Sequence, residues 1–223
     1  NVTVTTCNDD GVTYDGTTYQ YAVTATNATG GAAHTSTGPA ATFKAIGTPL
    51  AITTLVASAN TADKITVNYS TVNSRGASST VKIFEGGTLK SSKPESAGGG
   101  SPSSQTFTQS YDGNTHSYYA VVCNETTCGP NGNSSAAKPW TNPSISTFNV
   151  YASGTAAIVQ ITASGGGLPV HLSINASGSH PWSAAFDFSD GYSNTFTIAN
   201  AYSISDDVSA SLTDTSGRGR PSA

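Results

Sequence analysis

The chain has 223 residues and a formal net charge of -4, and only 10% of its residues are charged. Its 9 Lys plus Arg are too few to neutralise a phosphate backbone, so these numbers argue against nucleic acid as a partner. No apolar run approaches the roughly 18 residues of a membrane helix, so we expect no membrane insertion within this segment.

The composition is typical of β-strands. Ser, Thr and Gly dominate the polar positions, β-branched residues dominate the apolar ones, and Met is absent. Branched side chains fit a pleated, half-buried surface, while Gly, Asn and Asp supply turns. Helix formers such as Leu, Glu, Lys and Arg are scarce. The composition therefore predicts an all-β fold.

An internal repeat organises the chain. Residues 14–27 return as residues 111–124, with Tyr, Asp, Gly, Thr, Tyr and Asn in register. A period of about one hundred residues is too long for a solenoid and fits one antiparallel sandwich of about seven strands. We therefore expect β-modules in tandem. Such modules usually hold, space or bind, so we expect no enzyme.

Pro and Gly gather at residues 45–49 and 138–143, as expected of short links between modules. On this basis we predict three domains: residues 1–48 as the C-terminal half of a module, 49–140 as a complete module, and 141–223 as a third module that lacks a clear last strand. Half a sandwich cannot cover its own apolar face. The first domain should therefore be unstable alone, and the chain should be part of a longer array.

Within residues 49–140, apolar and polar residues alternate with the period of two that places one set of side chains on one sheet face. Residues 106–108 predict a further short strand, and residues 93–104, rich in Gly, Ser and Pro, predict a mobile loop. The predicted inward set is Ile65, Val67, Tyr69, Val81, Ile83, Tyr118, Ala120 and Val122.

The same order of strands recurs in residues 141–223. No apolar alternation follows residues 214–217, where a last strand would begin. The predicted inward set of this part is Ala157, Val159, Ile161, Val170, Leu172, Ile174, Phe196, Ile198, Val208, Ala210 and Leu212.

The cysteines suggest the compartment. Cys123 and Cys128 lie at the end of a predicted strand and in the loop after it, where a turn can bring them within bonding reach. We favour a disulfide, and hence an oxidising exterior, over two reduced cysteines that merely pack. A zinc site lacks further ligands at suitable spacing. Cys7 is either free or the mate of a residue elsewhere.

No catalytic or metal-binding arrangement stands out, and we expect no cofactor. The histidines are scattered and are expected to be surface or packing residues. The carboxylate pairs lie in turn-like contexts, where Asp caps the backbone. The residues concerned are His34, His116, His171 and His180, and the pairs Asp9 with Asp10, Asp187 with Asp190, and Asp206 with Asp207.

Residues 16–30 resemble the penultimate strand of the fibronectin type III family, with Tyr19 in the place of its buried corner tyrosine. Tyr69 and Ile161 occupy the slots where that family usually has a buried Trp, and His116 stands where Tyr19 does in the first repeat. The resemblance implies tandem immunoglobulin-like, or fibronectin type III, β-sandwiches. It also implies a bacterial secreted or cell-surface parent.

In such a sandwich the loops around residues 74–78 and 125–135 emerge at one end and form one contact surface. A second candidate is the outer sheet face, where Tyr119 and Val121 point outward beside Lys82 and Phe84. The alternative is that a neighbouring module or a long loop covers this face. The predicted ligand-binding residues are Ser74, Arg75, Gly76, Tyr119, Glu125, Thr126 and Asn131.

Our leading interpretation is a non-catalytic extracellular segment for binding, adhesion or spacing, monomeric, with a protein ligand such as a host factor. The alternative is an accessory spacer or carbohydrate-binding segment of a secreted polysaccharide-degrading enzyme, with Trp182 as the sugar-stacking residue. A third interpretation is a structural stalk without a ligand. Trp140 is expected to pack at a module junction.

Overall fold

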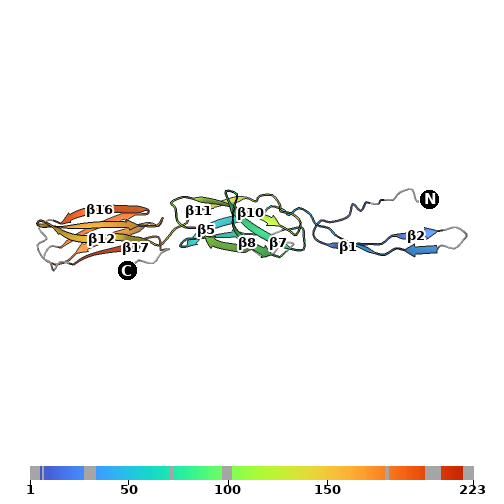
Figure 1. The fold of residues 1–223 in the computed structure, drawn as a ribbon, viewed down its shortest axis with the longest axis horizontal. Coiled ribbons are helices and arrows are strands. Elements are labelled where there is room, and N and C mark those ends of the chain that lie inside the picture. Colours follow the sequence, from blue (N-terminus) through green and yellow to red (C-terminus); the bar gives the residue numbers. More distant parts are fainter. Residues whose placement is uncertain are drawn as a thin grey trace. The chain divides into compact units, whose positions relative to one another are not determined.

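The computed structural model describes residues 6, 8–27, 34–70, 73–96, 102–178, 181–198 and 207–217. Within these ranges every regular element is a β-strand (Figure 1), which confirms the all-β prediction. The predictions for Cys7, His180 and Asp206, and for the side chain of His34, fall outside what is described.

The chain divides into two compact units. The first comprises Asn1–Val56, Asn68–Gln105 and Tyr118–Ser135. The second comprises Ala57–Val67, Thr106–Ser117 and Ala136–Ala223. The three domains expected from the sequence stay a prediction.

The first unit begins with a two-stranded ribbon. Strand β1 (Thr18–Tyr21) pairs antiparallel with β4 (Ala41–Lys44), and β2 (Thr24–Asn27) pairs with β3 (His34–Thr37). Tyr19 accepts a hydrogen bond at 3.0 Å from the backbone N–H of Thr13, as a corner tyrosine does, but its side chain is half-buried and not buried as expected. Large apolar side chains stay exposed along the ribbon, namely Tyr14, Tyr21, Val23 and Phe43.

Seven further strands form two sheets. Strands β5 (Leu55–Thr61), β6 (Lys64–Tyr69) and β9 (Ser103–Thr108) make one sheet. The other sheet has the order β11-β10-β7-β8. Its strands are β7 (Ser79–Glu85), β8 (Thr88–Glu95), β10 (His116–Cys123) and β11 (Ser134–Ala137). This division of strands between two antiparallel sheets is that of an immunoglobulin-like sandwich.

The predicted inward set of these strands is confirmed, because each of its side chains is at most 2% exposed. Val121, expected to be exposed on the outer face, is only 8% exposed. It lies opposite Lys82 in the β10–β7 register, so the solvent-accessible part of that face is smaller than the alternation suggests.

The loop predicted at residues 93–104 is too long, since β8 continues to Glu95 and β9 begins at Ser103. A polar cluster centred on Glu95 lies where β8 ends and β9 begins. One carboxylate oxygen of Glu95 accepts hydrogen bonds from Tyr69 at 2.5 Å and Ser103 at 2.7 Å, and it pairs with Lys93 at 3.2 Å. These partners come from separate strands, so composition alone could not reveal them.

The second unit contains a further pair of sheets with the orders β12-β13-β16 and β15-β14-β17. The strands are β12 (Ser144–Ser153), β13 (Ala156–Ser164), β14 (Val170–Ala176), β15 (Trp182–Phe188), β16 (Gly191–Ile198) and β17 (Val208–Asp214). Of the predicted inward set, Val159, Ile161, Val170, Leu172, Ile174, Ile198 and Leu212 are buried, and Ala157, Phe196, Val208 and Ala210 are half-buried.

The sequence did not predict strand β15, and this omission affects one earlier expectation. Asp187 lies within β15 and not in a turn, opposite His171 of β14. Its carboxylate lies 2.7 Å from Nδ1 of His171. The β15 strand was missed because its small and aromatic residues alternate without the β-branched side chains that mark the other strands.

Candidate functional site

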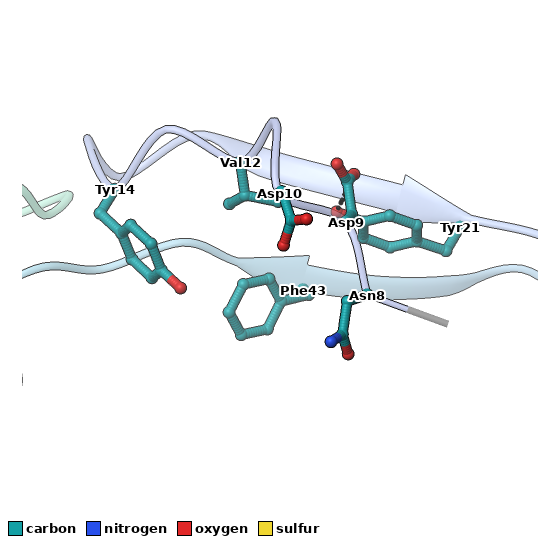
Figure 2. Close-up of a pocket in the computed structure, with 7 residues that line it drawn as sticks. All are labelled: Asn8, Asp9, Asp10, Val12, Tyr14, Tyr21 and Phe43. Atoms are coloured by element: carbon teal, nitrogen blue, oxygen red, sulfur yellow. Dashed lines mark hydrogen bonds between the residues drawn. The ribbon is translucent and has the colours of Figure 1, made fainter. Parts of the chain in front are cut away.

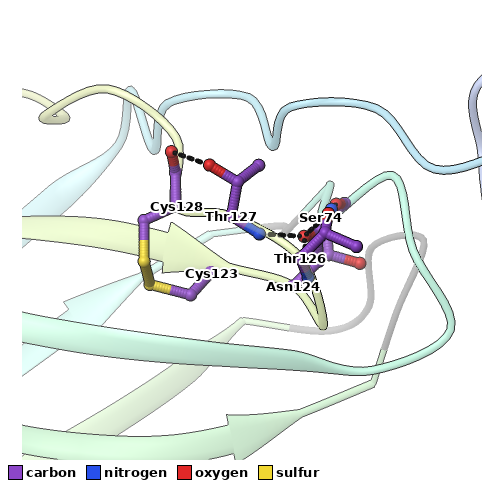
Figure 3. Close-up of a disulfide and its surroundings, with 6 residues drawn as sticks. All are labelled: Ser74, Cys123, Asn124, Thr126, Thr127 and Cys128. Atoms are coloured by element: carbon purple, nitrogen blue, oxygen red, sulfur yellow. Dashed lines mark hydrogen bonds between the residues drawn. A yellow bond between two sulfur atoms is a disulfide. The ribbon is translucent and has the colours of Figure 1, made fainter.

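The predicted disulfide is present and closes a short loop at the end of β10. Cys123 and Cys128 are bonded and also form an isolated β-bridge (Figure 3). Inside the loop, Oδ1 of Asn124 accepts hydrogen bonds at 3.0 Å from the backbone N–H groups of Thr126 and Thr127 and from the Thr126 hydroxyl. The disulfide and this side chain together fix the conformation of the loop.

The other end of the Asn124 side chain reaches two separate segments. Its Nδ2 donates hydrogen bonds of 2.7 Å to the carbonyl oxygens of Ser74 and Gly47. Ser74 lies in the loop between β6 and β7, and Gly47 follows β4. One amide group therefore joins three parts of the first unit that are far apart in the sequence.

Glu125 makes a second set of contacts at the same place. Its carboxylate accepts hydrogen bonds from the backbone N–H of Ala77 at 2.8 Å and of Ser78 at 3.0 Å, and from the Ser78 hydroxyl at 3.2 Å. It also forms an ion pair with Lys44 of β4. Lys44, and then the Ala77 and Ser78 amides, hold the pKa of Glu125 well below its usual range.

Backbone groups approach closely around these side chains. A Cβ on Gly76 would lie 2.5 Å from Oε2 of Glu125, and a Cβ on Gly16 would lie 2.7 Å from the backbone of Gly76. Arg75 has a positive φ of 48°, and its carbonyl oxygen accepts a hydrogen bond of 3.0 Å from the Gly47 N–H. Glycine is required at Gly16, which has a φ of 92° and whose added Cβ would meet backbone.

The structure thus brings together four of the predicted ligand-binding residues, Ser74, Arg75, Gly76 and Glu125. Ser74 is fully buried and Gly76 is buried, while both carboxylate oxygens of Glu125 accept hydrogen bonds from the protein itself. Thr126 and Asn131 are exposed. Ligand contact by these loop residues stays a prediction.

Sequence reasoning missed Lys44, Gly47 and Asn124 as members of this cluster. Gly47 lies in a Pro- and Gly-rich stretch, which was the available signal, although it was interpreted only as a link. Lys44 has no local signature, because its partner is 81 positions away along the chain.

Tyr119, the remaining predicted residue, lies apart from the loops on the outer face of the four-stranded sheet. Its ring stacks on that of Phe84, with centroids 5.4 Å apart and planes inclined by 13°. Phe84 is in turn opposite Leu89 of β8, whose side chain is 50% exposed. Lys90 forms an ion pair of 2.9 Å with Glu85, which lies opposite the buried Tyr118 and therefore points away from this face.

A pocket of about 470 Å³ lies on the ribbon of the first unit (Figure 2). Asp9 accepts hydrogen bonds from the Tyr21 hydroxyl at 3.0 Å and from the Gly11 N–H at 2.9 Å, which confirms its predicted place in a turn. Partial desolvation of the hydroxyl, and then the hydrogen bond to Asp9, raise the pKa of Tyr21. The pocket lining is Asn8, Asp9, Asp10, Val12, Tyr14, Tyr21 and Phe43.

Trp182, the residue on which the carbohydrate alternative depends, contacts other aromatic rings. It lies opposite Ala176 in the β14–β15 register, and its ring centroid is 5.4 Å from that of Phe196. Phe186 also contacts Phe196, at 5.4 Å. The half-buried indole therefore belongs to an aromatic row between β15 and β16.

Two further expectations concern single side chains. Trp140 is 5% exposed and donates a 2.8 Å hydrogen bond to the Ala59 carbonyl of β5, so its ring is packed, while its place at a module junction stays a prediction. His116 replaces the corner tyrosine, and its Nε2 lies 3.0 Å from Oδ1 of Asp112.

Among the described residues there is no group of three or more His, Cys, Asp or Glu side chains placed to hold a metal. The same residues include no helix with the length and apolarity to cross a membrane.

No protein-family model matches the chain, and no curated protein matches it. Among solved structures, it is similar to the FN1–FN3 domains of chicken CNTN1, at 13% identity and a TM-score of 0.33, with 92% of this chain and 73% of that chain covered. It is also similar to DIP-gamma IG1+IG2, at 9% identity and a TM-score of 0.42, with 76% of this chain and 89% of that chain covered. Because these similarities are low, the fold assignment rests on the strand orders and buried faces described above.

Proposed function

We propose that this chain is a non-catalytic binding segment of an exported protein, and that it contacts a protein ligand, such as a host factor, through the sheet face around Tyr119. The Cys123–Cys128 disulfide supports an oxidising compartment, since thiols are kept reduced in the cytosol. The two-sheet architecture supports a binding role, because such sandwiches hold recognition surfaces on a rigid frame.

The observation that carries the proposal is the row formed by Tyr119, Phe84 and Leu89. These side chains face outward from adjacent strands, and the outermost of them, Leu89, is 50% exposed. The same outer face carries Lys82, which lies opposite Ser92 of β8 in the strand register. An apolar centre beside polar and charged residues has the composition of a protein–protein contact, in which an aromatic anchor is surrounded by polar residues.

Surface plasmon resonance tests this proposal with the full 223-residue chain immobilised and purified plasma and matrix glycoproteins as analytes. We expect micromolar or tighter binding to a member of the panel, and a loss of at least about tenfold on Tyr119→Ala, the size typical of an aromatic anchor. Tyr151→Ala is the matched control, because Tyr151 is an exposed tyrosine on a different sheet. No binding by the unmodified chain, or equal loss in both variants, contradicts the proposal.

The carbohydrate alternative has less support, since the Trp182 ring packs against Phe196. Retention on insoluble glycans tests it directly. Retention that is lost with Trp182→Ala, and kept with Tyr119→Ala, would favour sugar binding over the protein contact proposed above.

A further inference from the structure

The loops first considered as a ligand surface contact another part of the same chain. The segment after β4 lies against them: the Gly47 N–H donates to the Arg75 carbonyl at 3.0 Å, and Asn124 donates to the Gly47 carbonyl. We call this set the proximal joint, defined by Gly16, Gly47, Arg75, Gly76 and Glu125.

The proximal joint is held by backbone packing as well as by side chains. The N–H of Gly16 donates at 2.8 Å to the carbonyl of Ala45, so the turn before β1 is tied to the linker after β4. The same turn lies so close to Gly76 that a Cβ on Gly16 would meet its backbone at 2.7 Å. The Glu125–Lys44 ion pair then connects the loop after β10 to the end of the ribbon.

A second set of contacts resembles this arrangement, although its turn glycine, Gly113, lacks the close approach that Gly16 makes. The linker N–H of Thr141 donates at 2.9 Å to the carbonyl of Gly166, as Gly47 does to Arg75. The turn that packs on it carries Tyr111, the repeat of Tyr14, and a Cβ on Gly167 would lie 2.6 Å from the Tyr111 ring. We call this set the distal joint, defined by Tyr111, Thr141, Gly166, Gly167 and Asp190.

The distal joint also has a carboxylate contact. The Tyr111 hydroxyl donates a hydrogen bond to the Asp190 carboxylate, across 79 positions of sequence. The Thr141 hydroxyl donates to the Asp63 carboxylate at 3.0 Å, and the Asp63 N–H donates to the Trp140 carbonyl at 2.7 Å. The linker is thus bonded on both of its sides.

We infer that the proximal and distal joints have the same structural role. In each, a turn, a linker and the following interstrand loop are held together by hydrogen bonds, one of them to a carboxylate. Each joint lies inside one compact unit. The role goes beyond ligand binding: each joint stiffens the unit in which it lies, because the linker there has few free rotations left once its N–H and C=O groups are paired. The Cys123–Cys128 loop serves the proximal joint by presenting Asn124 and Glu125.

Amide hydrogen exchange and ¹⁵N relaxation on the full chain test the proximal joint. In Glu125→Gln we expect the amides of Ala77 and Ser78 to exchange about tenfold faster, the factor that corresponds to one net hydrogen bond. In the unmodified chain, ¹⁵N relaxation should give the same rotational correlation time for the β1–β4 ribbon and for the four-stranded sheet. In Glu125→Gln the correlation time of the ribbon should become shorter than that of the sheet. Glu85→Gln, which removes an ion-paired glutamate of β7, is the matched control and should change neither quantity.

The distal joint is tested in the same way with Tyr111→Phe, which keeps the ring against Gly167 and removes only the hydroxyl. We expect the amides of β12 to β17 to tumble faster than those of residues 106–117, while Tyr14→Phe, at the equivalent repeat position, leaves this relation unchanged. Slow exchange at Leu172 shows that each variant remains folded. If ribbon and sheet tumble independently in the unmodified chain, or if Glu125→Gln alters nothing, the inference is wrong, whatever the binding assay shows for Tyr119.

Discussion

The side-chain amide of Gln105 donates a 3.2 Å hydrogen bond to the hydroxyl of Tyr69 and a 3.0 Å hydrogen bond to the carbonyl of Val81. Gln105 belongs to β9, Tyr69 to β6 and Val81 to β7, so one buried side chain links strands of two sheets within the first unit. The Tyr69 hydroxyl in turn donates a hydrogen bond of 2.5 Å to the carboxylate of Glu95.

Tyr69→Phe should therefore destabilise the protein by about 1–3 kcal/mol, because it leaves the buried Gln105 amide short of an acceptor. Urea denaturation followed by fluorescence measures the change. Tyr151→Phe removes an exposed hydroxyl and should stay within about 0.5 kcal/mol of the parent. Equal stability of the two variants would show that the buried network contributes nothing.

Glu125 predicts a pH dependence. Its folded-state pKa is depressed, so its stabilising contribution is complete above the ordinary value of 4.5 and is lost as the pH falls from there towards the folded pKa. The difference in unfolding free energy between the parent and Glu125→Gln should therefore shrink as the pH is lowered from 6 to about 3. A difference that stays constant over this range would contradict the assignment.

The Tyr111 hydroxyl should ionise at a higher pH than an exposed tyrosine. The hydrogen bond to Asp190, followed by burial, raises the pKa of Tyr111 to about 12. In ¹³C NMR of ring-labelled protein, its resonance should still report a protonated phenol at a pH where exposed tyrosines have ionised. Asp190→Asn removes the charge that opposes ionisation and should lower this pKa. Ionisation of Tyr111 together with the exposed tyrosines would be inconsistent with the contact.

The Cys123–Cys128 bond closes a small loop, so chain-entropy arguments give it a contribution of about 2 kcal/mol. Replacing both cysteines by serine should lower the unfolding free energy by this amount and speed amide exchange at Ala77 and Ser78. Reduction of the parent chain should reproduce the second effect. A stability loss without faster exchange would separate the disulfide from the joint.

Gly16 and Gly113 occupy the same place in the repeat and have similar positive φ values, 92° and 84°. Alanine is strained at both, but only at Gly16 does the new Cβ meet backbone, at 2.7 Å from Gly76. Gly16→Ala should thus cost more stability than Gly113→Ala, by about 1–3 kcal/mol, the range for overpacking. Thermal unfolding of the two variants gives the difference, and equal losses would argue against close packing at the proximal joint.

The sequence by itself determined the all-β class and the inward faces of the strands whose apolar residues alternate, but not β8, β11 or β15. Alternation with a period of two is a local property, so residues such as Ile65, Tyr118 and Leu172 could be assigned to the core without knowledge of their neighbours. The nearby cysteines 123 and 128 were predictable for the same reason. Strand β15 escaped detection because its alternation lacks β-branched residues.

Only the tertiary structure decided what the polar side chains do. Glu125 with Lys44, and Tyr111 with Asp190, are separated by 81 and 79 positions, and neither pair leaves a pattern along the chain. A hydrogen bond depends on distance and direction within a few ångströms, which are set when remote segments pack. For this reason a loop cluster that the sequence suggests as a free surface can hold the chain's own linker in the folded protein.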